Sequence, residues 1–159
     1  MTNKRVLIIG YGNPLRGDDG LGWEVAGRLA ACITDPSVAI MAVQQLTPEL
    51  SEPIHAVDLV IFVDASNEGE PGTWKYERVM PASAHAPSLG HHFDISGLLA
   101  YTGALFPSCP GALVVSVAAE SFACHENLSH KVEAVLPAVV GHIRRQIAAL
   151  HSSKEPLYA

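Results

Sequence analysis

Residues 6–22 read VLIIGYGNPLRGDDGLG. The four apolar residues that open this stretch form a short continuous run ending at a glycine, which predicts a strand buried on both faces of a parallel sheet. Apolar residues at helical spacing follow the loop and predict a helix from about Gly20 to Cys32, with Asp18 or Asp19 as its N-cap. The chain therefore opens as a strand, an acidic loop and a helix.

The same alternation of strand and helix patterns continues along the chain. Strands are predicted over 38–43, 59–63 and 113–117, an edge strand over 74–80, and helices from Thr47, over 94–105 and over 128–150. This order predicts a three-layer α/β/α sandwich with a mostly parallel sheet of about five strands, one of them an antiparallel edge strand. One domain over residues 1–150 is expected, followed by a loose tail over 151–159.

Composition narrows the possible partners. The chain has 159 residues, of which 48% are hydrophobic, a mean hydropathy of +0.22 and a formal net charge of −6. A negative chain with no lysine or arginine cluster beyond Arg144 and Arg145 is a poor match for the phosphates of nucleic acid. The apolar runs are too short to span a bilayer, and the three scattered cysteines indicate no disulfide framework. We expect a cytoplasmic protein that acts on a protein or small molecule, not on a membrane.

Polar residues that follow predicted strands form the candidate site. Ligands in open parallel sheets bind at the carboxyl ends of the strands, where Asp18 and Asp19 follow the first strand and Asp64 ends the third. The first loop lacks the third glycine of a dinucleotide fingerprint, and two carboxylates at the start of a helix would repel phosphate. Capping accounts for only one of the two aspartates, so a second role is expected for the other.

Histidines precede the predicted helix over 94–105. The pair His91 and His92 is the main candidate there, with His85 as the nearest rival. Two carboxylates and one imidazole would suit zinc, nickel, manganese or iron(II). Three protein ligands also leave coordination positions open, as catalysis requires.

Five blocks of this sequence, in order, resemble the hydrogenase maturation endopeptidases. They are GYGNPLRGDDGLG at 10–22, QQLTPEL at 44–50, VIFVDAS at 60–66, PGTW at 71–74 and HHFDISGLLA at 91–100. Each block is short, but together they extend over most of the chain at family-like spacing. The resemblance implies an endopeptidase that removes a C-terminal peptide from the nickel-loaded precursor of a nickel–iron hydrogenase large subunit.

The resemblance also implies which residues act. Members of the family are expected to use no serine or cysteine nucleophile and to recognise nickel that the substrate holds, so the metal comes with the substrate. Carried over, the catalytic and metal-recognising residues are Asp19, Asp64 and His91, with Asp19 standing where many members have Glu. Because the two histidines are adjacent, His92 is the alternative metal ligand.

Three further residues are candidate substrate contacts, namely Asn13, Asp18 and His92, and Asp18 is also a candidate for the helix cap or for support of the site. One departure from the family lies over 116–122, where SVAAESF stands in place of the usual G-I-E-P before a phenylalanine, so a loop that reaches the substrate differs here. The alternative function, from another class, is a non-proteolytic metal-binding or chaperone module for hydrogenase assembly.

Overall fold

The computed structural model describes residues 3–80, 94–125 and 127–153. Along the chain the elements are β1 (Val6–Tyr11), a 3₁₀ turn (Gly17–Gly20), α1 (Leu21–Cys32), β2 (Val38–Val43), a second 3₁₀ turn (Pro48–Leu50), α2 (Ser51–His55), β3 (Leu59–Ser66), β4 (Trp74–Val79), α3 (Ile95–Leu105), β5 (Gly111–Ala118) and α4 (His130–Ser152). Within these residues no helix combines the length and apolar character that crossing a bilayer requires.

The strands form one five-stranded sheet in the order β2-β1-β3-β5-β4. The β1–β2, β1–β3 and β3–β5 pairs are parallel, and β4 pairs with β5 in the antiparallel direction at the edge. The predicted α/β fold with one antiparallel edge strand is confirmed. The continuous apolar runs became β1, β3 and β5 because strands inside a parallel sheet bury both faces.

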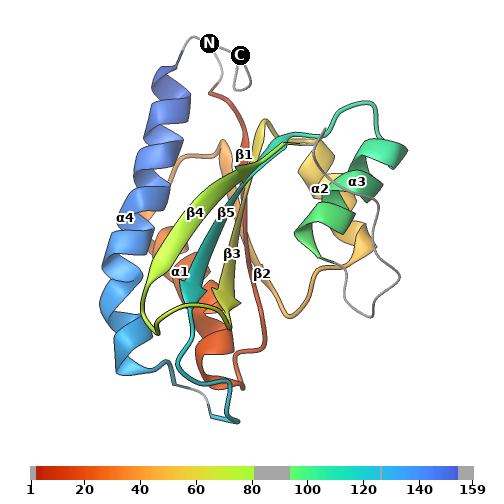
Figure 1. The fold of residues 1–159 in the computed structure, drawn as a ribbon. Coiled ribbons are helices and arrows are strands. Elements are labelled where there is room, and N and C mark those ends of the chain that lie inside the picture. The colour runs from red at the N-terminus through yellow and green to blue at the C-terminus, as the bar shows by residue number, and fades with distance from the viewer. Residues whose placement is uncertain (1–2, 81–93, 126, 154–159) are drawn as a thin grey trace.

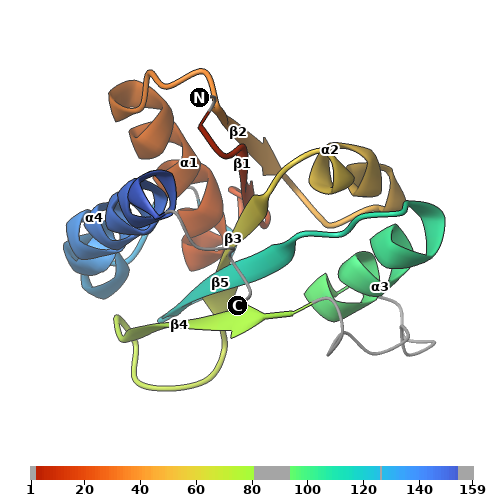
Figure 2. The same cartoon turned by 90° about the horizontal axis from the view of Figure 1, so that it is seen from above.

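Helices cover both faces of the sheet (Figures 1 and 2), with α1 and α4 on one face and α2 and α3 on the other. Side chains therefore alternate between two cores along each strand. In β1, Val6 and Ile8 belong to the core under α1 and α4, whereas Leu7 and Ile9 belong to the core under α2 and α3. This alternation is the period of two that a strand imposes on its side chains.

Two expectations about helix ends need correction. The N-cap of α1 is Gly20 without a side-chain hydrogen bond, so the prediction that Asp18 or Asp19 caps this helix is wrong. Both aspartates lie in the 3₁₀ turn before α1, and their carboxylates accept hydrogen bonds from residues outside this helix. At the other end of the chain α4 continues to Ser152, two residues beyond the predicted end at 150.

A close contact between glycines brings the first helix against the strands. A Cβ on Gly10 would lie 2.0 Å from the carbonyl oxygen of Gly22, and one on Gly22 would lie 2.6 Å from the backbone nitrogen of Tyr11. Only glycine allows so close an approach at these positions. The chain leaves β1 toward β2 on one side and returns to β3 on the other, so the carboxyl ends of β1 and β3 form a topological switch point.

Candidate active site

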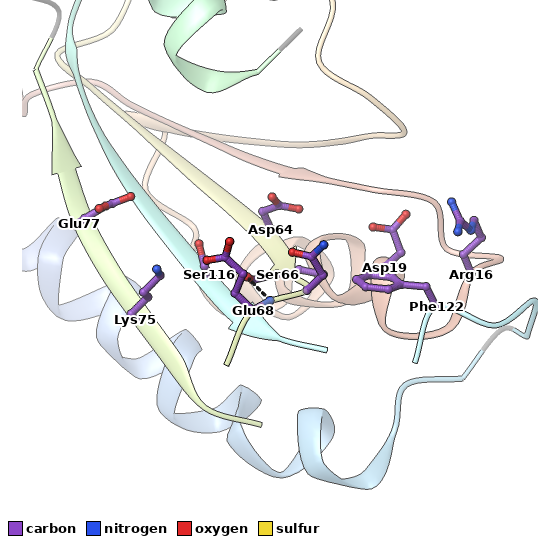
Figure 3. A pocket seen from close by; sticks show the side chains of 11 residues that line it. Arg16, Asp19, Asp64, Ser66, Glu68, Lys75, Glu77, Ser116 and Phe122 are labelled. Atoms are coloured by element: carbon purple, nitrogen blue, oxygen red, sulfur yellow. Dashed lines mark hydrogen bonds between the residues drawn. The ribbon is translucent and has the colours of Figure 1, made fainter. Parts of the chain in front are cut away.

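Two of the predicted site residues, Asp19 and Asp64, line one cleft at this switch point. The cleft has a volume of about 530 Å³, and its wall also includes Arg16, Ser66, Glu68, Lys75, Glu77, Ser116 and Phe122. Figure 3 shows both aspartate side chains projecting to the same side of the strand ends, with Arg16 and Phe122 beside Asp19. The structure thus brings together two carboxylates that are 45 positions apart in the sequence.

Asp64 has a perturbed environment. The hydroxyl of Tyr11 donates a hydrogen bond of 2.8 Å to its Oδ2 atom. Burial raises the pKa of Asp64 to about 6, and the negative charge of Asp19 adds to this, while hydrogen bonds from Tyr11 and from the backbone of Ala65 act in the opposite direction. Burial, and then the charge of Asp64, also raise the pKa of Tyr11, so the phenol stays protonated and donates. Asp64 is therefore a carboxylate whose charge the site tolerates poorly.

Asp19 is held by the backbone of the preceding loop. The amide nitrogen of Asn13 donates to its Oδ2 atom at 2.7 Å. Gly12, with φ of +136°, lies directly beneath: a Cβ there would come within 2.1 Å of the Asp19 carbonyl oxygen. The side-chain oxygen of Asn13 accepts a hydrogen bond from the Leu15 amide at 2.9 Å, which fixes the loop. The G-Y-G-N sequence thus shapes the turn that presents Asp19.

Asp18 points the other way and is fully buried. Its Oδ2 atom accepts hydrogen bonds from the amides of Glu120 at 2.8 Å and Ser121 at 3.2 Å and from the Ser129 hydroxyl at 2.9 Å. Its Oδ1 atom accepts one from the Ser129 amide at 2.7 Å. Burial would raise the pKa of Asp18, but these hydrogen bonds outweigh it and lower the pKa. The side chain is therefore neither a helix cap nor part of the cleft wall, and it ties the acidic loop to the chain before α4.

The histidine candidates cannot be placed in this arrangement, since His91, His92 and the rival His85 lie outside the described residues. Among the residues that are described, no group of three or more histidine, cysteine, aspartate or glutamate side chains could hold a metal ion. The pair Asp19 and Asp64 offers two carboxylates, which suit a divalent cation as part of a larger ligand set.

Several cleft residues were not identified as site residues from the sequence. Tyr11 gave no signal, because its partner Asp64 is 53 positions away. Lys75 and Glu77 lie two apart on the edge strand β4, and the predicted alternation there could have placed them on one face. Phe122 belongs to the segment that the sequence already marked as a loop reaching the substrate. It lies against the cleft from the side of Arg16 and Asp19 (Figure 3).

Solved structures of maturation proteases share this fold. The hydrogenase-maturating endopeptidase HybD from E. coli has a TM-score of 0.76 at 26% identity, over 91% of this chain and 92% of its own. The hydrogenase 2 maturation peptidase from a Thaumarchaeota archaeon has a TM-score of 0.72 at 25% identity, over 91% and 99%. The predicted resemblance to the hydrogenase maturation endopeptidases is confirmed by these structures. No protein-family model and no curated protein matches this chain.

These maturation-protease neighbours support a hydrolase that cuts a peptide bond. Its cleft contains two serines, Ser66 and Ser116. The hydroxyl of Ser66 accepts a hydrogen bond from the Glu68 amide at 3.1 Å, which is a turn contact. Within the described part of the chain no histidine is hydrogen-bonded to either serine. The described cleft therefore presents two serines without a histidine partner and the paired carboxylates of Asp19 and Asp64.

Proposed function

We propose that this endopeptidase removes a C-terminal peptide from the precursor of a nickel–iron hydrogenase large subunit after nickel has been inserted. The metal is part of the substrate, and the enzyme recognises it through Asp19 and Asp64, with His91 as the third ligand and His92 as the alternative. The observation that carries the proposal is the pair of carboxylates that line one cleft at the switch point of the sheet, in a chain whose fold matches solved maturation proteases.

The charge of the cleft supports a divalent cation. Four carboxylates and two basic groups line it, a formal excess of two negative charges. Burial raises the pKa of Asp64, and the charge of Asp19 raises it further because the two carboxylates repel each other. A divalent cation between them removes this repulsion and balances the excess. The remaining charges, on Arg16, Lys75 and the two glutamates, then offset each other around the substrate.

Cleavage in this arrangement does not require a nucleophile from the chain. Asp19 and Asp64 fix the position of the metal that the precursor carries, and with it the position of the scissile peptide. A metal held there can polarise the scissile carbonyl or lower the pKa of a bound water. The carboxylates thus serve as ligands and orienting groups. Cleavage is gated by metal loading, since an empty precursor gives them nothing to hold.

The experiment is a mass measurement on the precursor. Purified enzyme is mixed with nickel-loaded and with nickel-free precursor, and the mass of the large subunit is followed by mass spectrometry. We expect the loaded precursor alone to become shorter by its C-terminal peptide. An unchanged mass in both arms would refute proteolysis and favour the alternative, a non-proteolytic module that holds the immature subunit and forms a stable complex with it. Equal cleavage in both arms would refute metal recognition.

Matched variants test the site. Asp19→Ala and Asp64→Ala are expected to abolish processing while the protein stays folded, because both side chains lie at strand ends beside a cleft. Asp35→Ala is the control, since Asp35 hydrogen-bonds Ser37 at the amino end of β2, opposite to the cleft. Normal processing by either cleft variant would contradict the assignment. His91→Ala and His92→Ala decide between the histidines, and equal losses would leave the choice of His91 without support.

A further inference from the structure

Tyr11 occupies a special position behind the site. It is the last residue of β1, one residue beyond the Gly10–Val63 pair that joins β1 to β3. Its ring packs edge-on against Phe62 of β3, with ring centroids 6.5 Å apart and planes at 86°. The register of the parallel pair therefore places the hydroxyl beside Asp64, which follows Phe62 by two residues and projects from the same face of the sheet.

The hydrogen bond from Tyr11 fixes one oxygen of the Asp64 carboxylate. The Tyr11 hydroxyl donates to Oδ2 of Asp64 at 2.8 Å, the usual length of an O–H···O hydrogen bond. Asp19 repeats the arrangement, since its Oδ2 atom accepts the Asn13 amide at 2.7 Å. In both aspartates these two contacts involve Oδ2 and not Oδ1. Donors that hold one carboxylate oxygen orient the other for a metal.

We propose that Tyr11 is a positioning residue for Asp64: its hydroxyl holds Oδ2, so that Asp64 meets the substrate's metal through Oδ1 alone. The inference rests on the proposed function, because the metal is the one that the precursor brings. Asp19, held by the Asn13 amide, presents its Oδ1 in the same way. The enzyme then supplies one oxygen from each aspartate, besides the histidine of the proposed function, and the metal keeps its remaining positions for the ligands of the precursor and for the reacting water or carbonyl.

The Tyr11 hydroxyl contacts Asp64 and not the metal or the scissile bond, so it acts on the reaction only through its hydrogen bond to Asp64. This indirect role determines how its loss affects kcat and KM. Binding of a folded precursor draws on a wide surface, so the loss of one hydroxyl behind the site changes KM little. The position of the metal relative to the scissile bond depends directly on Asp64, and small displacements of a reacting group cost much of the rate. Loss of the hydroxyl should therefore lower kcat.

The test uses Tyr11→Phe in the complete enzyme with nickel-loaded precursor. The phenylalanine keeps the ring on Phe62 and removes only the hydroxyl. We expect kcat to fall roughly tenfold to hundredfold, with KM changed by less than about twofold. Tyr76→Phe is the control, because the Tyr76 side chain is 54% exposed and packs against His142 away from the cleft. This control should process the precursor at the wild-type rate.

A second variant separates positioning from packing. Tyr11→Leu removes the ring as well and is expected to lower kcat as Tyr11→Phe does, apart from any loss of folded protein measured by thermal unfolding. Wild-type kcat for Tyr11→Phe would overturn the inference, as would a loss that appears only in Tyr11→Leu and follows its unfolded fraction. If wild-type enzyme itself leaves the loaded precursor intact, the proposed function fails and this inference fails with it.

Discussion

Asp18→Asn should destabilise the folded protein, although it replaces a single oxygen by an NH₂ group. The carboxylate is fully buried and accepts four hydrogen bonds, three at Oδ2 and one at Oδ1. An asparagine keeps most of them with its oxygen at the Oδ2 position. Its NH₂ group then faces the Ser129 amide across 2.7 Å, where two donors meet.

The magnitude follows from these contacts. A buried donor left without a partner costs about 1–3 kcal/mol, and the bonds that remain lose the strengthening that a charged acceptor gives, about 1 kcal/mol more. We therefore expect a loss of roughly 2–4 kcal/mol. For a domain of this size that corresponds to a drop in melting temperature of roughly 5–15 °C.

Urea unfolding followed by circular dichroism at pH 7 measures this loss, with the midpoint expected to fall at an unchanged m-value. Asp35→Asn is the matched control, because Asp35 is only partly buried and an amide oxygen can still accept from Ser37. It should lose less than about 1 kcal/mol. An Asp18→Asn protein within about 0.5 kcal/mol of wild type would refute the view that this carboxylate ties the acidic loop to the segment before α4.

The same variant has a pH signature. Hydrogen bonding lowers the pKa of Asp18 in the folded protein below its ordinary value of 3.8. The stability that it contributes is therefore fully present above the unfolded-state pKa and is lost as the pH falls through the folded-state pKa. The difference in stability between wild type and Asp18→Asn should shrink in acid, below about pH 4. A difference independent of pH would contradict the role of the charge.

Two further predictions concern stability and pH. In metal-free protein, Asp64→Asn should raise the melting temperature at pH 7 by a few degrees. Burial and the charge of Asp19 raise the pKa of Asp64 to about 6 in the folded protein. At pH 7 the ionised carboxylate therefore destabilises the fold, and the neutral amide removes this cost. This gain should disappear below about pH 4, and no gain at pH 7 would contradict the assigned environment. His142 is 6% exposed, and burial, with Arg145, lowers its pKa. Wild-type stability should therefore decline as the pH falls below 6.5, the ordinary pKa of histidine. The melting temperature of His142→Phe should fall less than that of wild type between pH 7 and pH 5, and equal falls in the two proteins would refute this.

The layout of the sheet could be predicted from the sequence because its signals are local. Apolar runs of four or more residues mark strands buried on both faces, and the alternation over Trp74–Val79 marks an edge strand. Strand ends were less predictable. The third strand was expected to end at 63 but continues to Ser66, since Asp64, Ala65 and Ser66 pair with β5, and that register depends on residues about 50 positions away.

The site was predictable in part for the same reason. Asp19 and Asp64 each follow a strand that the sequence reveals, so their meeting at the carboxyl edge follows from the fold class. The orientation of Asp18 could not be predicted, because its main partner, Ser129, is 111 positions away. Local capping rules predicted that Asp18 or Asp19 would cap the nearby helix α1. In the structure three distant residues instead donate four hydrogen bonds to the buried carboxylate of Asp18. The Tyr11–Asp64 contact is non-local in the same sense.

The two aspartates of the acidic loop divide stability and chemistry between them. Asp18 faces inward, where its charge is matched by four donors and supports the fold. Asp19 faces the cleft, where its charge raises the pKa of Asp64 and opposes the ionisation of that neighbour. Because the two residues are adjacent in the chain, the buried Asp18 holds the half-buried Asp19 in a position that repulsion from Asp64 would otherwise disfavour. The repulsion is relieved when a cation binds both carboxylates, and its relief adds to the affinity for that cation. Under the proposed function, a metal-loaded precursor provides this relief and an empty one does not, so the fold itself favours the loaded precursor over the empty one.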